Sequence, residues 1–213
     1  MKNVSSGSLI PTKELHFPEG CTHFRKFDHY QIEIYQEALK HTPNRGCAVD
    51  VGAHVGIFTL YMERDFDKVV AFEPIEKNYL SLLINVRNHA VNTEKVSTRS
   101  VALSDKTHAV QMICPCNKNS GTWMVSADGK VTVNCMPLDL FSLRPNLIKL
   151  DIQGHELPAL RGAYNTITQY KPTLIVEVWN VQDTMHLTNY IEKTLNYKQA
   201  ARISKDCVYI PKE

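Results

Sequence analysis

Short apolar segments alternate with segments of helical periodicity along this chain, and no other sequence feature constrains the fold as strongly. Apolar runs typical of strands covered on both faces lie at residues 47–51, 68–72, 96–103, 147–151 and 173–179. Apolar residues recur at helical spacing at residues 30–40, 55–63, 78–91, 156–170 and 183–195. In the 78–91 helix this repeat falls on Leu80, Leu83, Ile84 and Val86. The alternation predicts an α/β fold with a doubly wound, mostly parallel sheet.

Three segments fall outside this alternation. Residues 1–29 mix polar and aromatic residues with chain-breaking prolines, so we expect residues 1–45 to form an irregular arm and one helix. Residues 46–213 are then a single domain, in which residues 104–139 alternate polar with apolar residues and are expected to insert β-hairpins. Residues 197–203 and 207–210 flank a polar turn and are predicted to close the sheet as an antiparallel strand pair.

The composition limits the kind of partner and the compartment. The 213 residues carry 24 Lys and Arg against 22 Asp and Glu, a net charge of +2, which argues against a nucleic-acid binder driven by charge. No apolar run approaches the roughly 18–20 residues of a membrane span. Residues 1–18 lack the basic and apolar regions of a secretory signal. We therefore expect a cytoplasmic protein without a metal site, whose cysteines are free thiols.

A glycine loop follows the first predicted strand, in the segment Val49–Gly56 (VDVGAHVG). Gly52 and Gly56 lack a Cβ, so the chain can turn tightly there and a ligand can lie against the backbone at a helix N-terminus. A dinucleotide site needs the pattern G-x-G-x-x-G, whereas these glycines are spaced G-x-x-x-G and follow Asp50. An anionic Asp50 would repel a pyrophosphate and attract the ammonium and sulfonium groups of S-adenosylmethionine. The alternative interpretation is that the two glycines only form a turn and bind no ligand.

Further polar residues end the next predicted strands, at the edge where doubly wound sheets bind ligands. Glu73 lies 23 positions after Asp50, where its carboxylate can accept hydrogen bonds from both hydroxyls of a ribose. Ser104 and Asp151 are placed on the same edge. A strand-ending acid can also be a solvated loop residue. Two acids, each at its own strand end, favour a shared binding site.

Several segments, in this order, resemble the FkbM family of class I S-adenosylmethionine-dependent methyltransferases. They are residues 50–56 (DVGAHVG), 71–74 (AFEP), 101–105 (VALSD), 148–156 (IKLDIQGHE), 160–163 (LRGA) and 172–177 (PTLIVE). The resemblance covers about residues 46–180 and implies a seven-stranded sheet. It also implies S-adenosylmethionine as cofactor and methyl transfer to an acceptor hydroxyl, on a small molecule or a glycan. Two positions depart from the family pattern, because His54 stands where Asn is common and Gln153 where many members have Glu.

The resemblance also implies roles for particular residues. Asp50, Gly52 and Gly56 would hold the methionine portion. Glu73 would bind the ribose, and Pro74 and Ile75 would pack against the adenine. The full set of implied cofactor-binding residues is Asp50, Gly52, Ala53, His54, Gly56, Glu73, Pro74, Ile75, Ala102, Leu103, Ser104 and Asp151. Asp151 would also face the methyl-transfer centre, where Asp151 or His155 is the candidate general base.

Other interpretations stay open. The enzyme alternatives are an N-methyltransferase or a nucleic-acid modifier, and the non-enzymatic one is a cofactor-binding module. His155 can also be a solvent-facing or capping residue, and Glu177 can be satisfied locally or line the acceptor pocket. The arm mixes basic with aromatic residues, as a lid or a nucleic-acid surface would: His16, Phe17, His23, Phe24, Arg25, Lys26, Phe27, His29 and Tyr30. We expect the arm and the 104–139 insertion to recognise the acceptor; the oligomeric state is left open.

Overall fold

The alternation of strands and helices is present in the computed structural model, which describes residues 14–21, 30–116, 118–178 and 181–212. Its helices are α1 (Ile32–Lys40), α2 (Ile57–Asp65), α3 (Glu76–His89), α4 (Glu156–Arg161), α5 (Tyr164–Tyr170) and α6 (Val181–Asn189). Its strands are β1 (Cys47–Val51), β2 (Lys68–Phe72), β3 (Val96–Arg99), β4 (Ala102–Leu103), β5 (His108–Ile113), β6 (Met124–Val125), β7 (Val131–Met136), β8 (Leu147–Leu150), β9 (Thr173–Glu177), β10 (Tyr197–Ile203) and β11 (Asp206–Pro211). None of the described helices is both long and apolar enough to cross a membrane.

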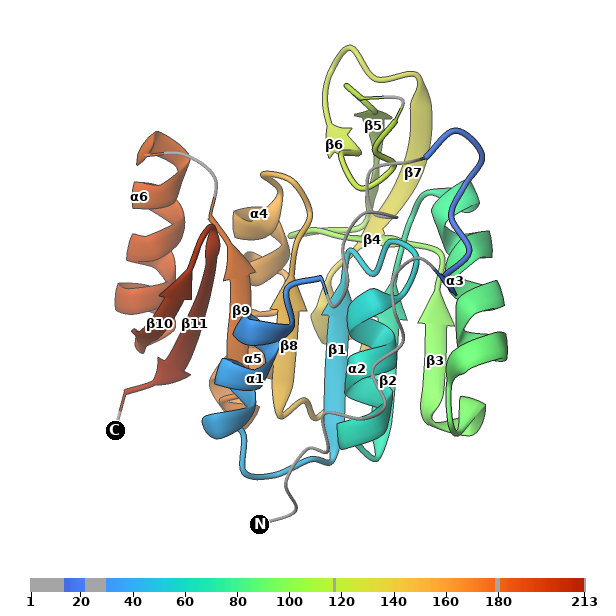
Figure 1. Ribbon diagram of the computed structural model, residues 1–213. Helices are drawn as coiled ribbons and strands as arrows, with labels where there is room; N and C mark the ends of the chain where they lie inside the picture. The colour runs from blue at the N-terminus through green and yellow to red at the C-terminus, as the bar shows by residue number, and fades with distance from the viewer. Residues whose placement is uncertain (1–13, 22–29, 117, 179–180, 213) are drawn as a thin grey trace.

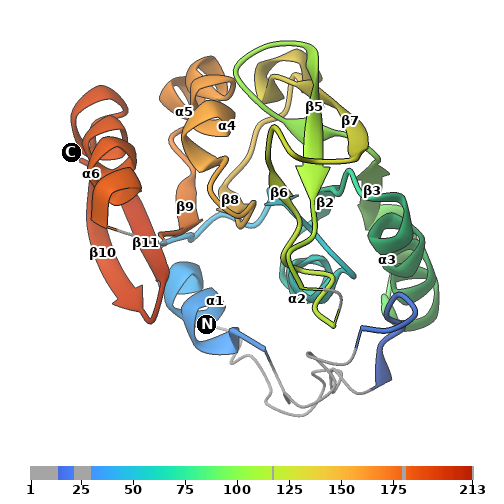
Figure 2. The same ribbon diagram turned by 90° about the horizontal axis from the view of Figure 1, so that it is seen from above.

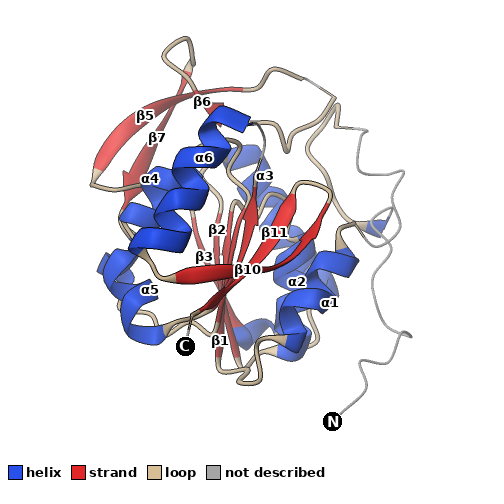
Figure 3. Ribbon diagram, turned by 90° about the vertical axis from the view of Figure 1, so that its left-hand side faces the viewer, coloured by secondary structure: helices blue, strands red, loops and turns tan. Residues whose placement is uncertain are grey.

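One sheet contains seven strands in the order β10-β11-β9-β8-β1-β2-β3 (Figure 1). The strands from β9 to β3 pair in parallel, whereas β11 runs antiparallel to β9 and β10 antiparallel to β11. The inner strands are apolar because helices bury both faces, with α1, α2 and α3 on one side and α4, α5 and α6 on the other (Figures 2 and 3). The predicted seven-stranded, doubly wound sheet with its closing antiparallel strands is confirmed.

A second sheet, in the order β4-β7-β5-β6, stands over the carboxyl edge of the first (Figure 1). Its strands β5, β6 and β7 pair in antiparallel fashion within the segment where hairpins were expected. The prediction of one strand over residues 96–103 is wrong, because β3 pairs with β2 and β4 pairs with β7. The chain leaves the first sheet after β3, and beyond β4 the Ser104 N–H donates to the Met136 carbonyl of β7 (3.1 Å).

The helix predicted over residues 156–170 is two helices, α4 and α5. Asp139 accounts for the break, because its N–H donates to the Gly162 carbonyl (3.0 Å). Its carboxylate accepts hydrogen bonds from the N–H groups of Asn165 (3.1 Å) and Thr166 (2.8 Å), which caps the start of α5. A Cβ at Gly162 would lie 1.9 Å from the Ser104 carbonyl oxygen, so only glycine permits this close approach.

Helix α3 buries a mixed face, in which Asn78, Ser81 and Asn85 lie beside Leu82 and Val86, and exposes most of the predicted apolar repeat. Of that repeat Val86 is buried, whereas Leu80, Leu83 and Ile84 are exposed. The buried Asn85 accepts a hydrogen bond from the His16 N–H (2.7 Å) and donates to the carbonyls of His16 (2.9 Å) and Val55 (2.8 Å). The polar residues of this face therefore anchor residues 14–21 of the arm and the loop after β1.

Candidate active site

A cavity of about 750 Å³ opens at the carboxyl ends of β1, β2 and β8, a volume typical of small-molecule sites. The second sheet borders one end of the cavity, and the start of α1 and the β10–β11 turn border the other. Ten residues assigned to the site from the sequence line it: Gly52, Ala53, His54, Glu73, Pro74, Ile75, Ala102, Leu103, Asp151 and His155. Asp50, Gly56 and Ser104 lie behind this lining.

The glycine loop brings the ends of β1 and β8 together. Gly52 has a φ of 77°, and a Cβ there would lie 2.1 Å from the Asp151 carbonyl oxygen. Gly56 begins α2 with a φ of 94°, and its Cβ would meet the Leu82 side chain of α3 at 2.7 Å. Gly52 therefore permits the close approach of the two loops at the cavity, whereas Gly56 permits the turn into α2 and its packing on α3.

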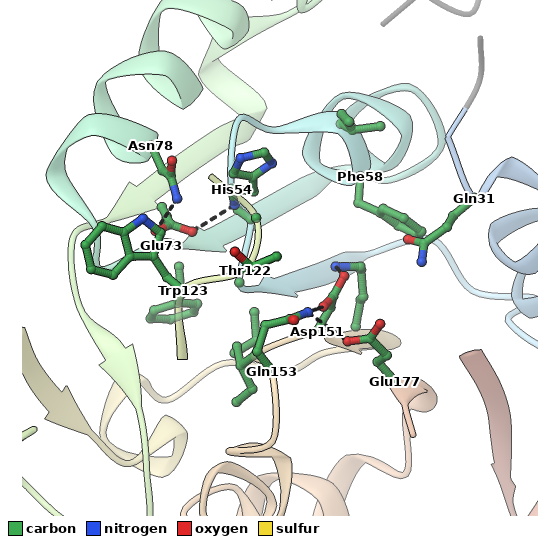
Figure 4. A pocket seen from close by; sticks show the side chains of 18 of the residues that line it. Gln31, His54, Phe58, Glu73, Asn78, Thr122, Trp123, Asp151, Gln153 and Glu177 are labelled. Atoms are coloured by element: carbon green, nitrogen blue, oxygen red, sulfur yellow. Dashed lines mark hydrogen bonds and ion pairs between the residues drawn. The ribbon is translucent and has the colours of Figure 1, made fainter. Parts of the chain in front are cut away.

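Glu73 connects three segments at the covered end of the cavity (Figure 4). Its Oε2 accepts a hydrogen bond from the His54 N–H (2.9 Å) and its Oε1 one from the Ile75 N–H (2.9 Å). Asn78 Nδ2 lies 3.5 Å from Oε1, and Asn78 Oδ1 is buried without a hydrogen-bond partner. Burial raises the pKa of Glu73 to about 7, against these hydrogen bonds.

An apolar wall adjoins Glu73. Ile75 packs with Met112 and Trp123 of the second sheet and its loop, and Trp123 lies beside Glu73 in Figure 4. The loop that carries Trp123 is tied down because Ser120 Oγ lies 2.6 Å from His54 Nε2. Burial lowers the pKa of His54 to about 3, so its imidazole is neutral at this contact. A carboxylate beside a flat apolar wall suits a nucleoside.

Asp50 is fully buried beneath the cavity. Its Oδ2 accepts a hydrogen bond from the Thr59 hydroxyl (2.7 Å), and its Oδ1 lies 3.8 Å from Lys149 Nζ. Burial raises the pKa of Asp50, against the attraction of Lys149. Other residues separate Asp50 from the cavity, so it adjoins the lining only through its contact with Lys149.

Asp151 lies between the two ends of the cavity, as Figure 4 shows. Its Oδ1 accepts a hydrogen bond from the Gln153 amide (2.9 Å), and its Oδ2 lies 3.4 Å from Lys149 Nζ. Burial acts to raise the pKa of Asp151, but the Lys149 ammonium and the hydrogen bonds to the carboxylate hold this pKa below its usual value. Sequence reasoning missed Lys149, although a lysine inside an apolar strand was a signal that could have found it.

His155 and Ser104 form a contact at the start of α4. The Nε2 atom of His155 lies 3.0 Å from Ser104 Oγ, and the imidazole also lines the cavity. Burial, together with the nearby His108, lowers the pKa of His155. Ala102 and Leu103 line the cavity next to this pair.

The end of the cavity next to α1 and the β10–β11 turn carries carboxyl groups from two strands. Glu177 ends β9 and accepts a hydrogen bond from the Gln153 amide (2.9 Å). Asp206 begins β11 and accepts one from the Gln31 amide (2.8 Å) at the start of α1. Burial raises the pKa of Asp206 to about 6. Sequence reasoning missed Gln31 and Asp206, which no local motif marks.

The two segments expected to recognise the acceptor, the arm and the 104–139 segment, lie at different places around the cavity. The 104–139 segment places Trp123 beside Glu73, at the end opposite to Glu177. In the arm, the Phe17 ring lies 6.1 Å from the His54 imidazole and Tyr30 lines the cavity. The other arm residues singled out, except His16, lie outside the described residues: His23, Phe24, Arg25, Lys26, Phe27 and His29. Within the described part of the chain, no three His, Cys, Asp or Glu side chains are arranged to hold a metal ion.

The chain matches a family model and a curated protein that are both described as methyltransferases. A family model described as the methyltransferase FkbM domain matches residues 50–209. "Methyltransferase 1" of Beauveria bassiana is 26% identical over 147 residues, which cover 56% of this chain and 59% of that protein. The chain thus spans about three fifths of this relative's length.

Two solved structures share the fold. The methyltransferase FkbM of Methylobacillus flagellatus superposes with a TM-score of 0.63 and 22% identity, over 93% of this chain and 49% of that chain. SMU.1697c of Streptococcus mutans, solved in complex with S-adenosylhomocysteine (SAH), superposes with a TM-score of 0.53 and 11% identity. That match covers 84% of this chain and 94% of the other.

Proposed function

The chain belongs to the FkbM family of methyltransferases, and from this we propose that it transfers the methyl group of S-adenosylmethionine to a hydroxyl oxygen of a small molecule or glycan. The observation that carries the proposal is the layout of the cavity. Glu73 and an apolar wall lie at one end, carboxyl groups and Gln31 lie at the other, and Asp151 lies between them. A structural neighbour that binds SAH supports the choice of methyl donor.

The covered end of the cavity suits an adenosyl group. Glu73 can accept hydrogen bonds from ribose hydroxyls, because a carboxylate has lone pairs beyond those used by the His54 and Ile75 N–H groups. The buried Asn78 Oδ1 has no partner in the structure, so a donor group on a ligand would satisfy it. Ile75 and Trp123 offer the apolar surface that an adenine ring requires.

S-adenosylmethionine supplies an electrophilic methyl group on a sulfonium centre. The chain has to hold the acceptor in line with that methyl group and accept the acceptor's proton. We assign the proton to Asp151, because its carboxylate lines the middle of the cavity and Lys149 keeps it ionised. We assign a positioning role to His155, because its Nε2 contacts Ser104 Oγ.

The end of the cavity next to α1 and the β10–β11 turn is the proposed acceptor site. The Glu177 and Asp206 carboxyl groups are each about 95% buried and border the cavity, where they can accept hydrogen bonds from hydroxyl groups. Negative charge on Asp206 and on the neighbouring Asp151 disfavours a phosphorylated or carboxylated acceptor, because like charges repel strongly when both are partly desolvated. An uncharged acceptor with several hydroxyl groups fits this end best.

The proposed reaction is tested by incubating the protein with methyl-labelled S-adenosylmethionine and a panel of sugars, phenols and amines. We expect label in a methyl ether and an equal amount of SAH, both measured by mass spectrometry. Heat-inactivated protein is the control. Label on nitrogen would replace the O-methyl proposal with N-methylation. An amine acceptor is the alternative because the same carboxyl groups would attract its ammonium form. SAH formation without a methylated acceptor would contradict both.

A further inference from the structure

Lys149 is a buried cation beside the centre of the cavity. It is 3% exposed, it lines the cavity, and it pairs across from Asp50 in the parallel ladder of β1 and β8. Its Nζ lies 3.4 Å from Asp151 Oδ2, 3.8 Å from Asp50 Oδ1 and 4.6 Å from the centre of the Phe58 ring. These contacts hold the ammonium next to the carboxylate that faces the proposed methyl-transfer centre.

A positive charge at this place opposes the binding of a cationic donor. The carboxyl groups that face Lys149 are those of Asp50 in β1, Asp151 directly after β8, Glu177 in β9 and Asp206 in β11. Those groups alone would attract a sulfonium strongly. Lys149 therefore reduces this attraction, and its own burial is tolerated only because these carboxylates surround it.

We propose that Lys149 weakens the binding of the sulfonium donor relative to that of its uncharged thioether product, an inference that rests on the proposed function. In the transfer the S–CH₃ bond breaks and its electron pair returns to sulfur. An O–CH₃ bond forms, and the acceptor proton passes to Asp151. The charge on sulfur disappears, so the product SAH no longer repels Lys149, whereas protonation of Asp151 gives up its attraction to Lys149 at 3.4 Å.

The test compares the affinities of two ligands that differ in this charge, S-adenosylmethionine and the uncharged thioether SAH. Both dissociation constants are measured by calorimetry for the wild type and for Lys149→Met. We expect the ratio of the two constants to shift roughly tenfold to fiftyfold in favour of S-adenosylmethionine, the size of a unit-charge interaction across several ångströms of intermediate dielectric. Lys149→Arg, which keeps the charge, should leave the ratio near the wild-type value.

Lys68→Met is the matched control, because Lys68 is exposed at the opposite end of strand β2 and its loss should not move the ratio. A purely structural role for Lys149 would weaken both ligands alike, and an unchanged ratio would overturn the inference. Should Lys149→Met fail to fold, the double variant Asp50→Asn/Lys149→Met is compared with Asp50→Asn, because removing both members of a buried ion pair leaves no uncompensated charge between them. The same shift in the ratio is expected. A wild type that binds neither ligand contradicts the proposed function instead.

Discussion

Asp151→Asn should lower turnover by roughly 10²–10⁴ and leave the affinity for SAH within a few-fold of wild type, the usual effect of losing a positioned acid or base. Asparagine has the same shape and can still accept the hydrogen bond from the Gln153 amide. Lys149 keeps Asp50 as a partner, so the fold should hold. Single-turnover transfer from labelled donor gives the rate, and calorimetry gives the affinity.

His155→Ala serves as the companion variant. Because His155 contacts Ser104 Oγ, we expect this change to lower turnover far less than Asp151→Asn. Loss of SAH binding in Asp151→Asn would make that carboxylate a ligand of the methionine ammonium. Full turnover in both variants would show that positioning alone drives the transfer and that the assignment of the base is wrong.

At a pH above 7, where the Glu73 carboxyl is ionised, Glu73→Ala should weaken SAH binding by roughly 2–4 kcal/mol, about 30-fold to 1,000-fold, from the loss of two hydrogen bonds to a charged acceptor. The substitution also releases the His54 and Ile75 N–H groups that the carboxylate holds, which should loosen the glycine loop. Glu73→Gln keeps one acceptor oxygen and should lose less affinity. Calorimetric titration of the three proteins measures the series.

Glu76→Ala is the control for this series, because Glu76 is exposed at the start of α3, three residues from Glu73. Its affinity for SAH should match wild type. Equal affinity in Glu73→Ala and wild type, with both proteins folded, would place the ribose elsewhere and make Glu73 a connector of the β1 and β2 loops alone.

The parts of the fold that follow from local pattern were predictable. The strands β1 and β2 have the predicted bounds. A short apolar run between two helical segments is typical of a strand that helices cover on both faces, so its ends can be read from the sequence. Glu73 and Asp151 were found because the ends of parallel strands meet at one edge, so each acid could be placed there from its strand alone. The glycine loop was predictable from the spacing of Gly52 and Gly56 directly after the first strand.

The remaining features depend on contacts between distant segments. Asp139 splits the helix after β8 by bonding to Gly162, Asn165 and Thr166, which no periodicity shows. Asn85 turns its face of α3 inward because it binds His16, which lies 69 positions away. Gln31 and Asp206, 175 positions apart, meet only when α1 and β11 pack at the cavity.

Calorimetric titration of the wild-type protein with SAH, run beside an identical titration with NAD, tests the central claim most directly. The glycine loop, Glu73 and the apolar wall predict a dissociation constant for SAH on the order of micromolar and a melting temperature that rises with ligand concentration. NAD should bind far more weakly, because Asp50 and Asp151 repel a pyrophosphate at this edge of the sheet. No heat with SAH, or equal affinity for NAD, would contradict the assignment as an S-adenosylmethionine-dependent methyltransferase.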